Sequence, residues 1–272
     1  MFKTKKKQII RVHADESKHV EDAFAVEEPL QISLSYAKVS GNNEQKNISI
    51  TMRTPGADRD LALGFLFTEG ILNSFSEVAD TKTGFNELEV VCSENADIDL
   101  SKIERHFYTS SSCGVCGKSS IDAIKTVRRI EAGEGDFKID PAWLKTIGDI
   151  QKQSQDIFKD TGGIHAATLF EVNGQIMLSR EDVGRHNAMD KLIGHAFQNA
   201  LLPLDKHVVL LSGRASFELI QKASMAGVKC IAAIGAPSSL AIELAEESDM
   251  TLIGFLKPDR FNIYCGEKRI SL

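Results

Sequence analysis

Two cysteines separated by two residues, Cys113 and Cys116, have the type and spacing best suited to chemistry in this chain. Thiols at this spacing in a reducing compartment serve as half of a zinc site, as a dithiol redox pair, or as a sulfur carrier. The thiolate is the nucleophile, and it is favoured by Lys118 and by a helix expected to begin near Ser120. The alternative without chemistry is a pair of free thiols in an exposed, mobile loop of small and polar residues, 108–120.

A zinc site at this pair is disfavoured, because a structural zinc needs four ligands, usually from two such pairs. The other thiols, Cys92, Cys230 and Cys265, are isolated, and we expect each to be a small packing residue. Zinc deaminases combine His-x-Glu with a later Pro-Cys-x-x-Cys. Here Ser112 precedes the first thiol, and His165 follows both thiols without the glutamate. We therefore expect no metal, and the polar loop also weakens a thioredoxin-like interpretation.

A second candidate site is formed by loops at the carboxyl edge of a predicted parallel sheet, where open α/β sheets bind ligands. Four such loops are expected to meet there: 180–187, 212–216, 235–239 and 255–260. Two of them open helices with glycine, hydroxyls and free backbone N–H groups, which suit an anion, and Arg214 adds a bidentate donor. Phe255 offers an aromatic face, and Lys257 and Arg260 two cations.

Taken singly, each of these loops has what any helix start needs, a serine N-cap and a glycine in a tight turn. Together they indicate a phosphorylated, nucleotide-bearing ligand. The chain has no Walker loop and no Gly-x-Gly-x-x-Gly, so neither an NTPase nor a dinucleotide dehydrogenase is favoured. Asp182 and His186 form a candidate acid–base pair.

From residue 161 onward, strands and helices alternate with short connections, which predicts parallel strands joined by right-handed helical crossovers. Asn173-Gly174 predicts an antiparallel hairpin at the edge of that sheet. The expected elements are strands 164–171 and 175–181, helix 185–197, strand 207–212, helix 216–226, strand 229–235, helix 238–247 and strand 250–256.

The first half of the chain is predicted to be mostly β. Residues 1–25 are charged and weakly patterned, and we expect a mobile lead-in. Apolar residues alternate over 30–36 and 48–52 around a Gly-Asn-Asn turn, which predicts a hairpin. Thr54 is expected to cap a helix that ends at Gly70. A strand at 88–92 and helices beginning near Ser120 and at Pro141 follow, the latter running through Phe158.

The composition bounds the class of protein. The chain has 272 residues, 42% hydrophobic and 26% charged, with a net charge of −6, which excludes disorder as the main state and argues against a general nucleic-acid binder. No apolar run approaches the roughly 18 residues of a membrane span, and no apolar core follows the basic start. Five unevenly spaced cysteines imply no disulfide framework, so we expect a cytoplasmic protein with reduced thiols. The length favours two domains, 1–107 and 108–272.

Ordered sequence blocks along nearly the whole chain resemble the formate dehydrogenase accessory sulfurtransferase family, the FdhD/NarQ type. The blocks are TMRTPG (51–56), LGFL (63–66), TEG (68–70), SCGVCG (112–117), TGGIHAA (161–167), EDVGRHNA (181–188), SGRAS (212–216), GAPSSLA (235–241), GFL (254–256) and RFN (260–262).

This resemblance implies a sulfur carrier required for formate dehydrogenase activity. It would take sulfur from a cysteine desulfurase as a persulfide on Cys113, with Cys116 as the supporting thiol, and transfer it to the bis(molybdopterin guanine dinucleotide) cofactor of molybdenum or tungsten. The implied cofactor-binding segment is Phe255, Leu256, Lys257, Pro258, Asp259 and Arg260. Its Pro258 and Asp259 depart from the basic or glycine residue expected there.

The resemblance also implies a homodimer and an α/β fold, a cytidine deaminase-like three-layer sandwich without the deaminase zinc ligands, preceded by a mostly β N-terminal part. Two rival functions stay open: a non-catalytic chaperone that only delivers the molybdenum cofactor, and a thiol-disulfide oxidoreductase.

Overall fold

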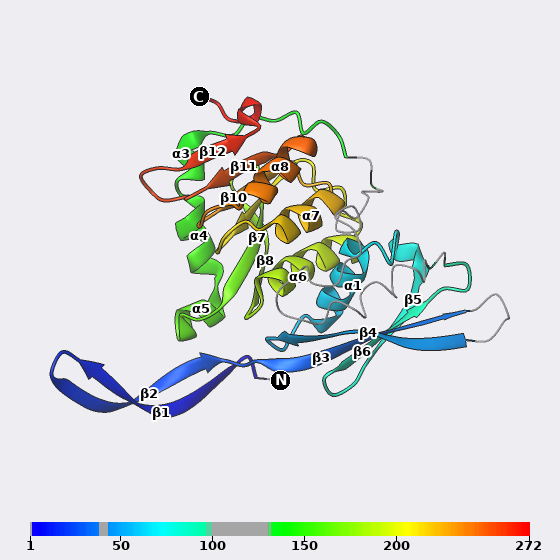
Figure 1. The fold of residues 1–272 in the computed structure, drawn as a ribbon, viewed down its shortest axis with the longest axis horizontal. Helices are drawn as coiled ribbons and strands as arrows, with labels where there is room; N and C mark the ends of the chain where they lie inside the picture. Colours follow the sequence, from blue (N-terminus) through cyan, green and yellow to red (C-terminus); the bar gives the residue numbers. More distant parts are fainter. Residues whose placement is uncertain (1, 38–42, 97, 99–129, 131) are drawn as a thin grey trace.

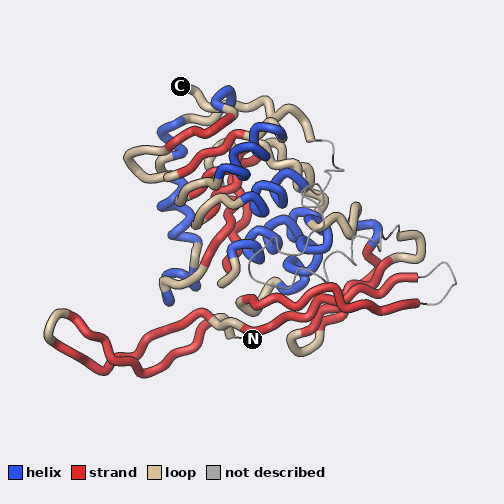
Figure 2. Tube along the Cα trace, in the orientation of Figure 1, coloured by secondary structure: helices blue, strands red, loops and turns tan. Residues whose placement is uncertain are grey.

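The computed structural model describes residues 2–37, 43–96, 98, 130 and 132–272. Its strands form a two-stranded ribbon, a four-stranded sheet and a six-stranded sheet, with most of the helices packed around the last of these (Figures 1 and 2). The chain is thus a mixed α/β protein with several sheets. None of its described helices is long and apolar enough to cross a membrane.

The six-stranded sheet has the strand order β12-β11-β10-β9-β7-β8. Its strands are β7 (His165–Glu171), β8 (Ile176–Asp182), β9 (His207–Leu211), β10 (Cys230–Ala233), β11 (Thr251–Gly254) and β12 (Asn262–Cys265). Strands β9, β10 and β11 are parallel, and β7 and β8 form an antiparallel hairpin at one edge, which confirms the prediction. The other edge is β12, antiparallel to β11, which the sequence pattern did not indicate.

Helices cover both faces of this sheet. One face packs against α6 (Arg185–Gln198), α7 (Phe217–Met225) and α8 (Ser239–Glu247), and the other against α3 (Pro141–Leu144) and α4 (Ile147–Ser154). The alternating residues of β9 divide accordingly, with Val209 in the first core and Val208 in the second.

The single helix predicted from Pro141 through Phe158 is wrong, because that segment is three short helices, α3, α4 and α5 (Asp156–Thr161). Gln155 has an extended backbone (φ −92°, ψ 94°) and separates the last two. The Glu181 carboxylate of β8 accepts hydrogen bonds from the backbone N–H groups of Ile157 and Phe158, at 3.1 and 2.9 Å. A side chain distant in sequence therefore caps a new helix where the local pattern favours continuation.

The N-terminal sheet has the order β4-β3-β6-β5. Its strands are β3 (Glu28–Ala37), β4 (Asn43–Arg53), β5 (Val78–Thr83) and β6 (Glu87–Cys92). The antiparallel β3–β4 pair confirms the predicted hairpin, and β6 confirms the predicted strand at 88–92. β5 was not predicted, because its residues are mostly exposed and give no apolar alternation.

The expectation of a mobile lead-in at residues 1–25 is wrong. This segment is an antiparallel ribbon of β1 (Thr4–His13) and β2 (Glu16–Ala25), paired without interruption from Thr4 with Ala25 to His13 with Glu16. It extends away from the rest of the molecule (Figures 1 and 2). Most of its side chains are exposed on both faces, so the backbone ladder forms without the apolar alternation from which a strand is predicted.

Thr54 is not the N-cap of the first helix. Helix α1 (Asp58–Thr68) begins four residues later, and its N-cap is Ala57, with a left-handed φ of 54°. The Thr54 N–H instead donates to Asp182 (3.1 Å), and its hydroxyl accepts from the Val183 N–H (3.2 Å). The helix ends near Gly70, as predicted.

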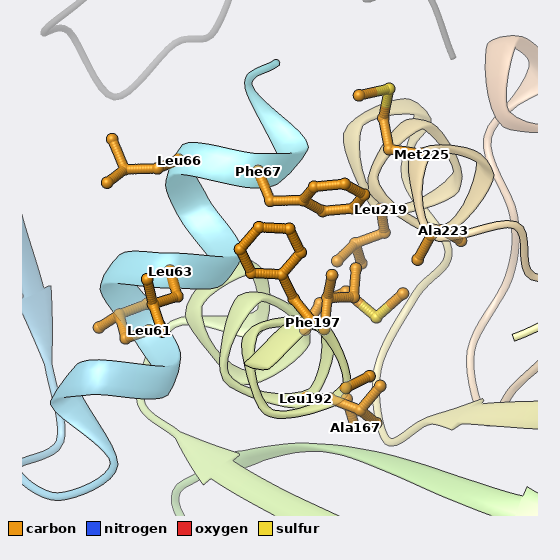
Figure 3. Packing of buried hydrophobic residues seen from close by; sticks show 14 of the residues in the cluster. Leu61, Leu63, Leu66, Phe67, Ala167, Leu192, Phe197, Leu219, Ala223 and Met225 are labelled. Atoms are coloured by element: carbon orange, nitrogen blue, oxygen red, sulfur yellow. The ribbon is translucent and has the colours of Figure 1, made fainter. Parts of the chain in front are cut away.

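One apolar core joins the N-terminal sheet to the α/β part. It runs from β3 and β6 through α1 and α6 to β9. It contains the rings of Phe67 and Phe197, which are tilted by 31° with their centroids 4.9 Å apart (Figure 3). The helix expected from Ser120 and the domain boundary expected at 107/108 lie outside the described residues.

Candidate functional site

The two cysteines singled out from the sequence, Cys113 and Cys116, lie outside the residues that the structure describes. The loops predicted to bind a ligand are described in full. The described part of the candidate site is therefore the sheet edge at which these loops meet.

The structure brings the predicted loops together at the carboxyl edge of β9, β10 and β11. The Ser212 N–H donates to the Ala166 carbonyl (3.0 Å), and the Gly235 N–H donates to the Gly213 carbonyl (2.9 Å). The Phe255 N–H then donates to the Gly235 carbonyl (3.1 Å). Because β7 runs antiparallel to β9, its first residue, His165, and the end of β8 lie at the same edge.

Phe255 is held in an unusual conformation at this edge. Its φ is +51°, a left-handed value that a bulky residue seldom adopts, and its side chain is 41% exposed. The next residue, Leu256, is buried in the core, and its N–H donates to the Ala233 carbonyl (3.1 Å). The core thus holds the backbone while the aromatic ring faces outward, and such strain is characteristic of ligand-binding positions.

The remaining residues of the predicted segment form an exposed turn. The Lys257 N–H donates to the Arg260 carbonyl (2.8 Å), so Pro258 and Asp259 occupy the middle of the turn. All four side chains are exposed. In the described part of the chain, no carboxylate forms an ion pair with Lys257 or Arg260, and both cations are free to meet an anionic ligand.

Arg214 belongs to the loop 212–216, and its side chain passes the neighbouring loop 235–239. Its side chain is exposed, and a Cβ on Gly235 would lie only 3.0 Å from its Cγ. Gly235 therefore leaves the space that the arginine side chain crosses. Helix α7 begins three residues later, and its N-cap, Ser216, accepts no hydrogen bond from the first turn of the helix. The first N–H groups of α7 are thus not capped by this side chain, and Arg214 precedes them.

The interpretation of Asp182 and His186 as an acid–base pair is wrong. Asp182 is fully buried and forms an ion pair with Lys191 (2.7 Å). It also accepts the hydrogen bond from the Thr54 N–H, so its role is to hold the segment before α1 against the end of β8. His186 instead has its Nε2 3.1 Å from the carboxylate of Glu218 and 3.4 Å from the hydroxyl of Ser216. Hydrogen bonding to His186 lowers the pKa of Glu218 below its usual value.

His165 is a neutral group at this edge near pH 7. Burial lowers the pKa of its imidazole below 6.5, and the nearby Arg185 cation lowers it further. Its Nδ1 would be 3.3 Å from a Cβ placed on Gly213, so that glycine leaves room for the ring. The edge thus combines a neutral imidazole with several guanidinium and ammonium groups.

A cleft of about 310 Å³ lies between the N-terminal sheet and helices α1, α6 and α7. Its polar lining includes His186 and Glu218, together with Lys222, which pairs with Asp190 (2.9 Å) and Glu69 (3.3 Å). Sequence analysis missed Asp190, Lys222 and Glu69. These residues could have been found as polar side chains within otherwise apolar helix faces. Recognising them requires knowing which helix faces are buried, and the sequence alone does not give that. Within the described residues, no group of three or more metal-binding side chains is present.

Comparison with known proteins identifies the family of this chain. A profile of the FdhD/NarQ family matches residues 25–271. The chain belongs to the FdhD/NarQ family. Among its curated relatives, the sulfur carrier protein FdhD of Streptomyces avermitilis is 42% identical, over 99% of this chain and 96% of the relative. The protein of the same name from Picrophilus torridus is 41% identical, over 93% and 94%.

A solved structure supports the fold of this FdhD/NarQ chain. A crystal structure described as that of a candidate formate dehydrogenase accessory protein from Desulfotalea psychrophila superposes with a TM-score of 0.73 at 20% identity. The match covers 98% of this chain and 99% of the other. Both parts of the fold described above are therefore shared with that protein.

Proposed function

We propose that this protein is a sulfur carrier required for formate dehydrogenase activity. The observation that carries the proposal is its near full-length similarity, above 40% identity, to proteins named sulfur carriers. The sequence adds the Cys113–Cys116 pair, and the structure adds a cationic sheet edge suited to an anionic ligand.

The first step loads the carrier. The Cys113 thiolate attacks the terminal sulfur of a persulfide on a cysteine desulfurase, a sulfur–sulfur bond forms on Cys113, and the desulfurase thiolate leaves. This transfer moves a neutral sulfur atom and needs no external oxidant. The product is a persulfide on Cys113.

The second step delivers the sulfur, and Cys116 has two candidate roles. In the first role, Cys116 modifies the reactivity of the Cys113 thiol. In the second, the Cys116 thiolate attacks the Cys113 sulfur and closes a disulfide, releasing hydrosulfide. In the second case Cys116 supplies the two electrons that reduce the sulfane sulfur, and a dithiol reductant must later reopen the disulfide. The acceptor is the bis(molybdopterin guanine dinucleotide) of molybdenum or tungsten, bound as substrate before its insertion into formate dehydrogenase.

The sheet edge is the proposed binding site for that substrate. Arg214, Lys257 and Arg260 offer cations to its phosphates, and the N-termini of α6, α7 and α8 offer backbone N–H groups. The Phe255 ring offers a face on which a base can stack. Leu256 supports this segment from the core, and Pro258 and Asp259 shape its turn.

The test is intact-protein mass spectrometry after incubation with a cysteine desulfurase and cysteine, followed by a digest. We expect a reductant-labile gain of one sulfur on the peptide that contains Cys113. No gain, with the desulfurase shown to be active, would favour a chaperone that only delivers the cofactor. A Cys113→Ala variant should bind the cofactor without activating formate dehydrogenase. If Cys116→Ala abolishes turnover equally and no sulfur is carried, the protein is a thiol-disulfide oxidoreductase.

Three further properties complete the proposal: a cytidine deaminase-like topology for the α/β part, a cytoplasmic location, and a homodimer. We also propose that the chain is divided into two domains, residues 1–107 and 108–272.

A further inference from the structure

The β1–β2 ribbon extends from the molecule with both outer edges free of backbone partners among the described residues. α5 lies beside part of the ribbon, while residues 16–19 toward the tip are all exposed. A free strand edge presents unpaired N–H and C=O groups to another strand. The charges along the two edges decide which of them can pair with a second copy.

The β1 edge is protected against self-pairing. Its charged side chains are Lys5, Lys6, Lys7 and Arg11, with no acidic residue in the strand. No antiparallel register of two β1 strands therefore places opposite charges together. Lysines on an edge strand are a common device against unwanted pairing.

The β2 edge has the opposite character. The order Lys18, His19, Val20, Glu21, Asp22 is self-complementary in charge about Val20. If two β2 strands pair antiparallel about that residue, Lys18 lies opposite Asp22 of the partner subunit, and His19 lies opposite Glu21 of the partner subunit. Each such pair occurs twice, because the arrangement has a two-fold axis.

From this pattern we infer that two copies of the chain associate through their β2 edges, forming a four-stranded antiparallel sheet with Val20 on the two-fold axis. Ile9 lies opposite Val20 within one ribbon, and both are only half-buried in the single chain. The pairing aligns Ile9 and Val20 with the same two residues of the other copy, in an apolar row across four strands. It also closes on itself, whereas a β1 edge against a β2 edge would leave free ends and extend indefinitely.

Existing ion pairs within the ribbon do not oppose this arrangement. Lys18 pairs with Glu16 (3.1 Å), Asp22 with Arg11 (3.7 Å) and Glu21 with Lys6 (2.9 Å), and all six side chains are between 39% and 74% exposed. Exposed pairs of this kind contribute little to stability and rearrange readily.

A charge exchange tests the inference on the full chain by analytical ultracentrifugation. Lys18→Glu and Asp22→Lys each replace two attractive pairs per dimer with two repulsive ones, and we expect each to weaken dimerisation about tenfold. An equimolar mixture of the two variants should form heterodimers, because both cross-pairs are attractive again. The double variant should recover near the wild-type dissociation constant. Lys5→Glu, on the other edge, should leave it unchanged.

The inference rests on the proposed homodimer but not on sulfur transfer, and the outcomes separate these. A wild-type chain that stays monomeric at all concentrations overturns both the homodimer and this surface. A dimer that neither single variant weakens, or whose variants do not recover on mixing, overturns the surface alone.

Discussion

Gly64 of α1 and Gly194 of α6 face each other where the two helices cross. A Cβ on Gly64 would overlap the Asp190 carbonyl, and a Cβ on Gly194 would overlap the Asp60 carbonyl. The helix backbones are thus in direct contact at this crossing. Since α1 belongs to the N-terminal part and α6 to the α/β part, this pair of glycines sets the distance between the two.

We expect Gly64→Ala and Gly194→Ala each to destabilise the fold by about 3 kcal/mol or more, because the backbones must separate to admit a methyl group. Chemical denaturation monitored by circular dichroism measures the loss. The matched control is Gly163→Ala, where the nearest atom to the new Cβ is 3.8 Å away. Equal stabilities for all three variants would contradict a backbone contact at the crossing.

Loss of the buried ion pair between Lys191 and Asp182 should also destabilise the fold strongly. Lys191→Met leaves the Asp182 carboxylate buried without its cation, and it removes the hydrogen bond from Nζ to the Thr54 carbonyl (2.8 Å). We expect a loss of about 3–5 kcal/mol in the free energy of unfolding. Lys152→Met breaks the exposed pair with Asp149 and should change stability by less than about 0.5 kcal/mol. Similar effects from the two variants would argue against a structural role for the buried pair.

Two substitutions of Phe255 distinguish the effect of its backbone strain on stability from the effect of its ring on ligand binding. Glycine adopts a φ of +51° without penalty, so Phe255→Gly should be more stable than Phe255→Ala by about 1 kcal/mol in thermal unfolding. Both variants lack the ring and should bind GDP, a fragment of the proposed substrate, at least about tenfold more weakly than the wild type by calorimetry. Unchanged GDP binding would remove Phe255 from the proposed site.

The lowered pKa of His165 predicts how stability depends on pH. The folded state binds a proton at His165 less readily than the unfolded chain, so the protein should lose stability as pH falls below about 6.5 toward the lowered pKa. His207, whose pKa burial also lowers, contributes in the same direction. His165→Gln should therefore reduce this loss in denaturation curves between pH 7.5 and 5. An unaltered pH slope would show that His165 is not buried as described.

Regular elements were predictable where their apolar residues are buried. Helices α7 and α8 and the β3–β4 hairpin follow from periodicity, because one face of each enters the core. Strands β9, β10 and β11 instead follow from short continuous apolar runs, because both of their faces are buried. The β1–β2 ribbon and β5 were missed because their exposed residues show no such period. Their pairing comes from backbone hydrogen bonds, which any sequence can form.

The sequence by itself determined the family, the cysteine pair, and which loops lie at the carboxyl edge of the sheet. These depend on residue identity and on connection order. Only the tertiary structure decided the partners of the ionisable side chains, such as Asp182 with Lys191 and His186 with Glu218. Arg180 likewise pairs with Asp60, 120 positions away in the chain. A buried charge is stabilised by the opposite charge nearest in space, and local sequence carries no record of that distance.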